Sequence, residues 1–164
     1  MFPAKDRLTI CFAHIVYQLQ ERFLLRGMTV NSFEVRTPDA FEMRIGEVDV
    51  VFVAGMWRNH LLERAQLMRI SQSIGAGTDQ FDRAKLTERG IRLASAQGVN
   101  ARAVAEHAMA LILAMARKLP EARDNQAKHF WRGMVSDIAQ REDELNGKTL
   151  LIIGLGGIGS RLAQ

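Results

Sequence analysis

Cysteine is nearly absent from this sequence, which has one, Cys11, among 164 residues. A single cysteine cannot form a disulfide within the chain, and its position in an apolar run predicts a small buried core residue rather than a reactive thiol. The N-terminal residues lack the longer apolar stretch and the small-residue cleavage site of a secretory signal. The longest uncharged apolar stretch of the helical part, 108–116, is far shorter than the roughly 20 residues that span a bilayer. These absences predict a protein of the reducing cytoplasm without a membrane segment.

Proline-rich, glutamine-rich and serine-rich tracts are also missing, as are internal repeats, so no large disordered segment is expected. The formal net charge of +4 raises the possibility of a nucleic-acid partner. The basic residues, however, occur singly among acidic ones, and aromatic residues do not alternate with them as on a base-stacking surface. We therefore expect no nucleic-acid partner; salt-sensitive retention on DNA would indicate the opposite.

Short apolar runs alternate with helical patterns through the first hundred residues, which is typical of a parallel sheet built from βα units. Asp82 is expected to cap one of the helices, and Gly27 and Gly90 to end two of them. The run at 48–53 is apolar at nearly every position, as in a central strand covered on both faces. The expected strands are 8–12, 29–35, 48–53, 68–74 and 91–95, and the expected helices are 14–26, 58–65 and 83–89.

The pattern changes near Gly98, which we take as the boundary between domains 1–98 and 99–164. A helix is expected over 101–117, with Asn100 as its N-cap and apolar residues on more than one face. Such a helix requires burial on several sides, either between domains or in a subunit interface. Pro120 fits the first turn of a second helix, which would run to about residue 130. A last strand is expected over 149–153.

A glycine-rich turn follows that last strand directly. Gly154 permits a tight turn, Gly156 lets the backbone approach a pyrophosphate, and Gly159 allows the next helix to pack closely. Exposed N–H groups at the start of that helix would hold the phosphate. A G-x-G-x-x-G pattern alone is common and could be a plain strand-to-helix turn, but the preceding strand favours a dinucleotide site.

A second glycine turn, at 75–77, follows the expected strand 68–74. Ligands of open α/β sheets bind at the carboxyl ends of strands, where closely spaced N–H groups can bind a carboxylate. The alternative is a loop that needs a positive φ at Gly75 or Gly77. Taken alone, the residues favour this alternative.

Three segments together resemble the D-isomer-specific 2-hydroxyacid dehydrogenases, a family that includes phosphoglycerate dehydrogenase, glyoxylate/hydroxypyruvate reductase and formate dehydrogenase. The order and spacing of the segments agree from about residue 68 to residue 164, and three ordered motifs are far more specific than one. The segments are Ile70-Ser-Gln-Ser-Ile-Gly-Ala-Gly-Thr-Asp79, Gly98-Val-Asn-Ala-Arg-Ala-Val-Ala-Glu-His107 and Leu145-Asn-Gly-Lys-Thr149 leading into the glycine turn.

The resemblance implies an α/β protein with a flavodoxin-like substrate domain, followed by the beginning of a Rossmann dinucleotide-binding domain. It implies hydride transfer between NAD or NADP and a D-2-hydroxy acid, with the substrate carboxylate held by the backbone of Gly75, Ala76 and Gly77. Trp57 lies in the loop that would face the variable end of the substrate. The resemblance implies that the cofactor is bordered by Ala76, Val104, Gly154, Gly156, Gly157, Ile158 and Gly159.

The resemblance also places the catalytic arginine, the carboxylate and the acid/base histidine of the family beyond residue 164. No catalytic residue is therefore expected within this chain, because none of its four histidines occupies the family position. The 164 residues are expected to be a truncated dehydrogenase without hydride-transfer activity, and the helix region 101–117 is expected to form a homodimer. An alternative is a non-enzymatic, NAD(H)-sensing protein on the same scaffold, similar to the corepressors of this family.

Overall fold

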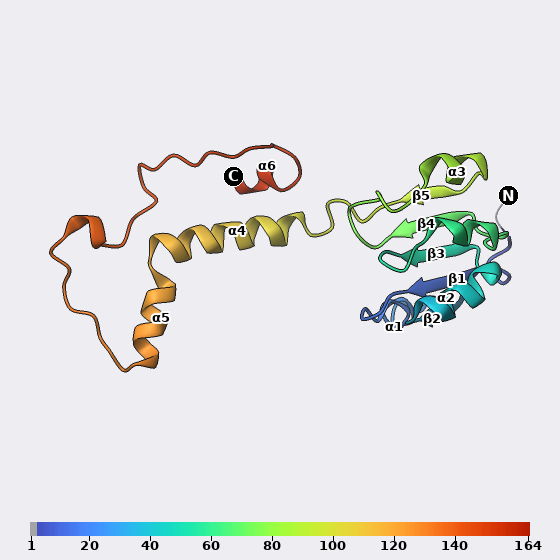
Figure 1. The fold of residues 1–164 in the computed structure, drawn as a ribbon, viewed down its shortest axis with the longest axis horizontal. Helices are drawn as coiled ribbons and strands as arrows, with labels where there is room; N and C mark the ends of the chain where they lie inside the picture. Colours follow the sequence, from blue (N-terminus) through green and yellow to red (C-terminus); the bar gives the residue numbers. More distant parts are fainter. Residues whose placement is uncertain (1–2) are drawn as a thin grey trace. The chain divides into compact units, whose positions relative to one another are not determined.

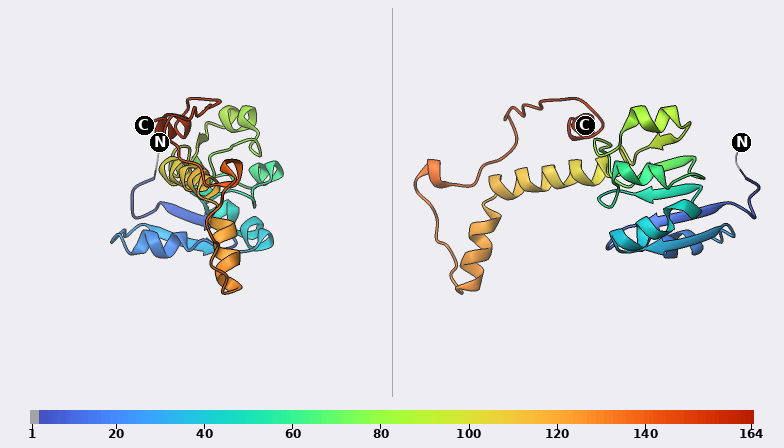
Figure 2. Two further views of the ribbon diagram at one scale, coloured as in Figure 1. Left: turned by 90° about the vertical axis from the view of Figure 1, so that its left-hand side faces the viewer. Right: turned by 45° about the vertical axis from the view of Figure 1, so that its right-hand side comes forward.

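A computed structural model describes residues 3–164 and divides into two compact units. The N-terminal unit extends to Gln97, and the C-terminal unit is Gly98–Gln164. Figures 1 and 2 show the helices and strands of each unit, which are described separately below.

The N-terminal unit is built on one five-stranded parallel sheet. The strand order is β2-β1-β3-β4-β5, the flavodoxin-like order, in which ligands bind outside the carboxyl ends of the strands. This sheet confirms the predicted α/β class. The five predicted strands are all present; the first is shifted by one residue and the other four are shorter than predicted. They are β1 (Thr9–Ala13), β2 (Asn31–Val35), β3 (Val50–Val53), β4 (Ile70–Ser73) and β5 (Arg92–Ala94).

Helices cover both faces of this sheet. On one face, Phe23 of α1 (Leu19–Leu24) packs against Phe12 of β1, with the ring centroids 5.4 Å apart. The other face carries the larger core, to which Phe41 and Leu86 contribute. The elements behind that larger core are α2 (Pro38–Arg44), η1 (Ile45–Glu47), η2 (Asn59–Glu63) and α3 (Arg83–Glu88).

The predicted helix 14–26 is wrong in its first part, because α1 begins only at Leu19. The His14 side chain explains the difference: its Nδ1 accepts the backbone N–H groups of Val16 at 3.0 Å and Tyr17 at 2.8 Å. Such a local side-chain bond competes with helix formation. The predicted helix 58–65 is a short 3-10 helix, η2.

Caps define the ends of the other helices. The carboxylate of Asp82 accepts the Lys85 N–H at 3.1 Å, which confirms the predicted N-cap of α3. Gly90 follows α3 with a φ of +67°, a conformation that glycine adopts without strain. Helix α2 was not predicted, although Thr37 caps it through a bond from the Ala40 N–H at 3.2 Å.

The single cysteine lies in the larger core, as predicted, and burial raises the pKa of the Cys11 thiol to about 12. We expect iodoacetamide to alkylate Cys11 very slowly at pH 8 in the folded chain and completely in denaturant, as measured by mass spectrometry. The unfolded thiol ionises near its ordinary pKa of 9.0, whereas the folded thiol stays neutral to about 12. Stability should therefore fall as the pH rises above 9. Rapid labelling of the folded chain would contradict this burial.

The C-terminal unit contains helices but, within residues 98–164, no strand. Its elements are α4 (Ala101–Ala116), α5 (Leu119–Ala127), η3 (Ile138–Gln140) and α6 (Gly159–Leu162). Helices α4 and α5 confirm the two predicted helices. Asn100 occupies the N-cap position of α4, as predicted, but its side chain makes no cap hydrogen bond. Among the described residues, no helix has the length and apolar character needed to cross a membrane.

The predicted strand 149–153 is also wrong, since these residues belong to no strand. A parallel strand exists only through backbone bonds to a neighbouring strand. Residues 98–164 supply no such neighbour, and the apolar side chains of Leu150, Leu151 and Ile153 are exposed.

Candidate functional site

The loop after β4 lies at the carboxyl edge of the parallel sheet. The pairing of β4 with β3 fixes the position of this loop. The pairing continues past the strand ends, where the Ile74 N–H donates to the Val53 carbonyl at 3.1 Å. Three consecutive residues then turn into solvent, Gly75, Ala76 and Gly77, all of them exposed. The structure thus places the predicted carboxylate-binding residues where open α/β sheets bind ligands.

The backbone N–H groups of this loop are free to bind a ligand. Within residues 3–164, the N–H groups of Gly75, Ala76 and Gly77 donate to no acceptor of the protein. Consecutive free N–H groups form a concave positive surface that suits a small anion. The loop can therefore accept a carboxylate without breaking any bond within the fold.

Neither glycine of this loop is required by backbone conformation. The φ angles of Gly75 and Gly77 lie outside the left-handed region. The alternative interpretation, a loop that needs a positive φ at one of these glycines, is therefore wrong. A Cβ on Gly75 would come no closer than 3.9 Å to Ser73 Oγ, and one on Gly77 no closer than 3.5 Å to Asp79 Oδ2, both ordinary contacts. The fold itself would accept side chains at both positions.

Three hydrogen bonds hold the loop in place. The Ser73 hydroxyl donates to the Gly77 carbonyl at 2.9 Å, and the Ala96 N–H, which follows β5, donates to the Gly75 carbonyl at 3.1 Å. The Arg83 guanidinium, from α3, donates to the Thr78 hydroxyl. The carbonyls of Gly75 and Gly77 are thus occupied by the protein, while the N–H groups of residues 75–77 are not. Sequence reasoning missed Ser73, whose only signal is a serine on the core-facing side of a strand.

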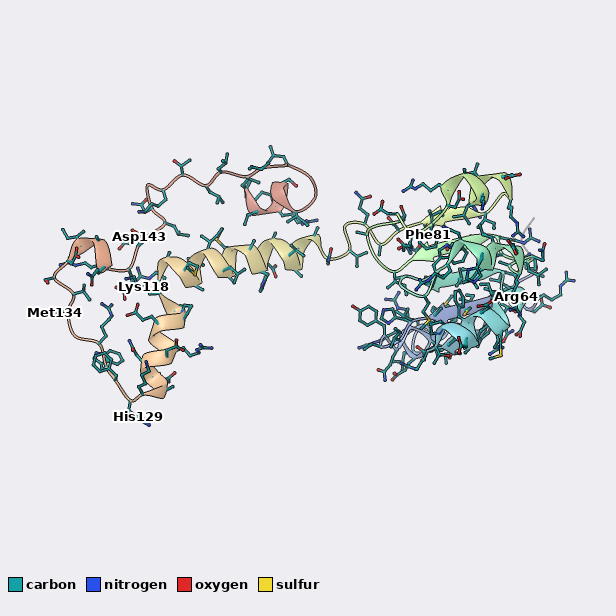
Figure 3. The ribbon with its side chains drawn as sticks, viewed as in Figure 1. Arg64, Phe81, Lys118, His129, Met134 and Asp143 are labelled. Carbon is teal, nitrogen blue, oxygen red and sulfur yellow. The ribbon has the colours of Figure 1, made fainter. Side chains whose placement is uncertain are left out.

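Trp57 is a core residue in this structure, 1% exposed. Its ring packs against Phe81, with the centroids 5.1 Å apart, and its indole N–H donates to Asn59 Oδ1 at 3.0 Å. Figure 3 labels Phe81 in the densely packed interior of the N-terminal unit. The contact between Trp57 and a substrate stays a prediction, and this burial favours a packing role. The neighbouring exposed side chain is Arg58, whose guanidinium donates to the carbonyls of Gly55 at 2.8 Å and Trp57 at 2.7 Å.

The second glycine turn, 154–159, has glycines that the fold does require. Gly154 has a φ of +96°, and a Cβ on Gly159 would lie 2.0 Å from the Gly154 carbonyl oxygen. Gly156, in contrast, has open space around its Cα. Helix α6 follows at once, with the Ser160 N–H donating to the Gly156 carbonyl at 2.9 Å. The backbone at Gly156 is therefore open to close approach, although no strand precedes the turn.

The N–H groups of this second turn are also free. Within the part of the chain that the structure describes, those of Gly156, Gly157, Ile158 and Gly159 donate to no protein acceptor. Of the two predicted cofactor neighbours outside this turn, Ala76 lies in the edge loop, and Val104 lies in the first half of α4 and is partly exposed.

Other features of the chain do not form a site. The described residues contain no cluster of three or more histidine, cysteine, aspartate or glutamate side chains that could hold a metal ion. A cavity of about 620 Å³ in the C-terminal unit is lined by α5 and the segment that follows it, with Lys118 and Met134 on its walls (Figure 3). It includes none of the predicted site residues.

The fold and the edge loop define the chain as an α/β protein with a row of free backbone N–H groups at the carboxyl edge of a flavodoxin-like sheet. Residues 12–157 match the D-isomer specific 2-hydroxyacid dehydrogenase family, catalytic domain. The chain belongs to this family, which confirms the resemblance seen in its three motifs.

Individual relatives agree with this membership. The chain is 38% identical over 105 residues to a D-3-phosphoglycerate dehydrogenase of Archaeoglobus fulgidus, a match covering 63% of this chain and 19% of the relative. It is 31% identical over 159 residues to glyoxylate/hydroxypyruvate reductase B of Yersinia enterocolitica, covering 94% of this chain and 48% of the relative. The chain thus spans about half the length, or less, of these curated relatives.

Solved structures show the same fold. An NADPH-dependent glyoxylate/hydroxypyruvate reductase from Sinorhizobium meliloti, in complex with citrate, matches with a TM-score of 0.74 at 24% identity, covering 96% of this chain and 49% of that one. An NAD-dependent formate dehydrogenase from Staphylococcus aureus, in complex with NAD, matches with a TM-score of 0.70 at 21% identity, covering 95% of this chain and 52% of that one. At these identities the likeness concerns the fold alone.

Proposed function

We propose that this chain supplies the carboxylate cradle and the pyrophosphate turn of an NAD(P)-dependent oxidoreductase that acts on the CH–OH group of a D-2-hydroxy acid. In this proposal residues 1–98 are part of the substrate domain and residues 99–164 begin the dinucleotide-binding domain. Family membership supports the class of reaction. The observation that carries the proposal is the row of free N–H groups at 75–77 on the carboxyl edge of the sheet.

The two glycines of the edge loop support this proposal because the fold does not need them. Neither has a positive φ, and neither has a neighbour that would exclude a Cβ. Glycine at such a position lets something outside the chain approach the backbone closely. A carboxylate that accepts bonds from Gly75, Ala76 and Gly77 would need that approach, and charge-assisted bonds of this kind are about twice as strong as neutral ones.

The second turn suits the pyrophosphate of a nicotinamide dinucleotide. Free N–H groups at the start of α6 can hold phosphate oxygens, and the open space at Gly156 leaves room for them. The cofactor, NAD or NADP, would supply or accept the hydride when bound. The solved structures of the same fold include both kinds, one in complex with NAD and one with NADP and malonate.

Within this proposal the role of the chain's residues is to bind and orient. The edge loop holds the carboxylate and so fixes the position of the adjacent carbinol carbon. The loop thus contributes to the reaction by positioning the substrate and not by proton transfer. No residue of the chain is proposed as the acid/base group. We also propose that α4 takes part in a homodimer interface, because Leu111, Leu113 and Met115 on this helix are exposed and apolar.

Pyruvate and its neutral amide, pyruvamide, test the carboxylate cradle directly. We expect millimolar pyruvate to shift the backbone amide NMR signals of Gly75, Ala76 and Gly77, and pyruvamide to shift them much less, because the neutral amide lacks the negative charge and the second acceptor oxygen of the carboxylate. The same sample with NADH should show no oxidation at 340 nm, since the proposal assigns no acid/base group to residues 1–164.

The variant Ala76→Pro tests the cradle itself, because proline has no backbone N–H and the central donor is lost. We expect it to weaken pyruvate binding while the far-UV circular dichroism is retained. Equal shifts with pyruvate and pyruvamide, or shifts only at distant basic side chains, would contradict the proposal. Measurable turnover by the chain would contradict the absence of a catalytic residue.

A further inference from the structure

Two buried serines face the larger core from the same strand, and only one of them has a partner. Ser71 and Ser73 of β4 are both 0% exposed. Their register partners on β3 are Val51 and Val53, which belong to the larger core, so both serines lie on that apolar face. A hydroxyl buried without a hydrogen bond is destabilising, so serine is an unfavourable choice for such positions unless the hydroxyl has a use.

The two hydroxyls differ in what they contact. Ser71 Oγ has no hydrogen-bond partner among the described residues. Ser73 Oγ, two residues further along the strand, donates to the Gly77 carbonyl at 2.9 Å. This bond spans the loop and joins its last residue to the end of the strand from which it starts.

The bond also sets the direction of a peptide dipole. Because the Gly77 carbonyl is held toward Ser73, its negative end faces the strand rather than the solvent side of the loop. The Gly75 carbonyl is likewise occupied, by the Ala96 N–H. Neither of these two carbonyls is therefore free to turn toward the loop N–H groups, where its oxygen would repel a carboxylate.

We infer that Ser73 is a positioning residue for the anion cradle, acting through its bond to the Gly77 carbonyl and not by touching the ligand. This inference rests on the proposed function of the loop. It assigns the hydroxyl a role in ligand binding that a serine in the core would otherwise lack. Arg83, through its bond to Thr78, supports the same loop from α3.

The test compares Ser73→Ala with Ser71→Ala, two identical substitutions on the same face of one strand. A net hydrogen bond contributes about 0.5 to 1.5 kcal/mol, so Ser73→Ala is expected to weaken pyruvate binding about two- to tenfold. Ser71→Ala should leave pyruvate affinity unchanged, because it removes a hydroxyl without a partner. Ser73→Thr keeps the hydroxyl and should restore the affinity.

The readouts are the pyruvate dissociation constant from amide NMR shifts, the difference between pyruvate and pyruvamide, and the ¹⁵N order parameters of residues 75–77 without ligand. The order parameters should fall in Ser73→Ala alone, because the loop loses its bond to the strand. Equal affinities for Ser73→Ala and Ser71→Ala would overturn the inference while leaving the cradle in place. Absence of pyruvate binding in the unchanged chain would overturn the cradle itself, and the inference with it.

Discussion

Replacing Trp57 with alanine is expected to lower the free energy of unfolding of the N-terminal unit by about 3 to 5 kcal/mol. The indole ring is 1% exposed, and its removal leaves a cavity beside Phe81. It also removes the donor to Asn59 Oδ1, an oxygen that accepts the Asp82 N–H at 2.9 Å as well. Because Asp82 caps α3, the loss should extend to the start of that helix.

Trp131 offers a matched control, since it is the only other tryptophan of the sequence and is 94% exposed. Trp131→Ala should change the free energy of unfolding by no more than about 0.5 kcal/mol. Urea unfolding followed by circular dichroism measures both variants, and Trp57→Phe should recover part of the loss by refilling the cavity. A Trp57→Ala chain that unfolds like Trp131→Ala but binds pyruvate less tightly would instead place the ring at the substrate, as the family resemblance implies.

The sheet was predictable because each of its strands is marked locally. The run at 48–53 is apolar at nearly every position, and a strand with that pattern belongs inside a sheet covered on both faces. Asp82 and Gly90 mark the ends of α3 by capping and positive φ, two rules that depend only on neighbouring residues. The presence of these strands and the two ends of α3 therefore follow from short stretches of sequence.

The errors occur where the outcome depends on a partner that the local sequence does not show. Residues 14–18 have a helical pattern, but the His14 ring accepts two backbone N–H groups and forms a turn instead. The run 149–153 has the apolar pattern of a strand, yet residues 98–164 contain no strand to pair with it. Pattern gives the tendency of a segment, whereas a strand also requires a neighbour.

The candidate site was predictable in position but not in its supporting contacts. The family motif located Gly75, Ala76 and Gly77, and the strand order explains why they lie at the carboxyl edge. The bond from Ser73 to Gly77 was not predictable, because a serine in a strand more often bonds to water or to nothing specific.

The two glycine turns show that the same residue type is used for different physical reasons. At 75–77 glycine is allowed but not required by the chain, which points to a ligand. At 154–159 the chain itself requires some of the glycines, so those positions say less about a ligand than Gly156 does. Substitution can separate these two reasons.

Gly159→Ala is expected to destroy the second turn, whereas Gly156→Ala should preserve it. A Cβ on Gly159 would lie 2.0 Å from the Gly154 carbonyl oxygen and 3.2 Å from Ile152 Cγ2. Because the closest atom is backbone, the turn must move, at a cost of about 1 to 3 kcal/mol or more. The amide NMR signals of residues 152–163 should therefore shift widely in Gly159→Ala.

Gly156 has a φ outside the left-handed region, and no atom lies within 4 Å of the position that a Cβ would take, so in Gly156→Ala the amide signals should change only near residue 156. The same substitution places a methyl group where the proposed pyrophosphate would approach the backbone. Amide shifts of residues 154–159 caused by millimolar NAD should therefore be reduced in Gly156→Ala even though the turn is intact. Unchanged NAD shifts in this variant would show that Gly156 does not face the cofactor, and similar spectra for both variants would contradict the close contact between Gly159 and Gly154.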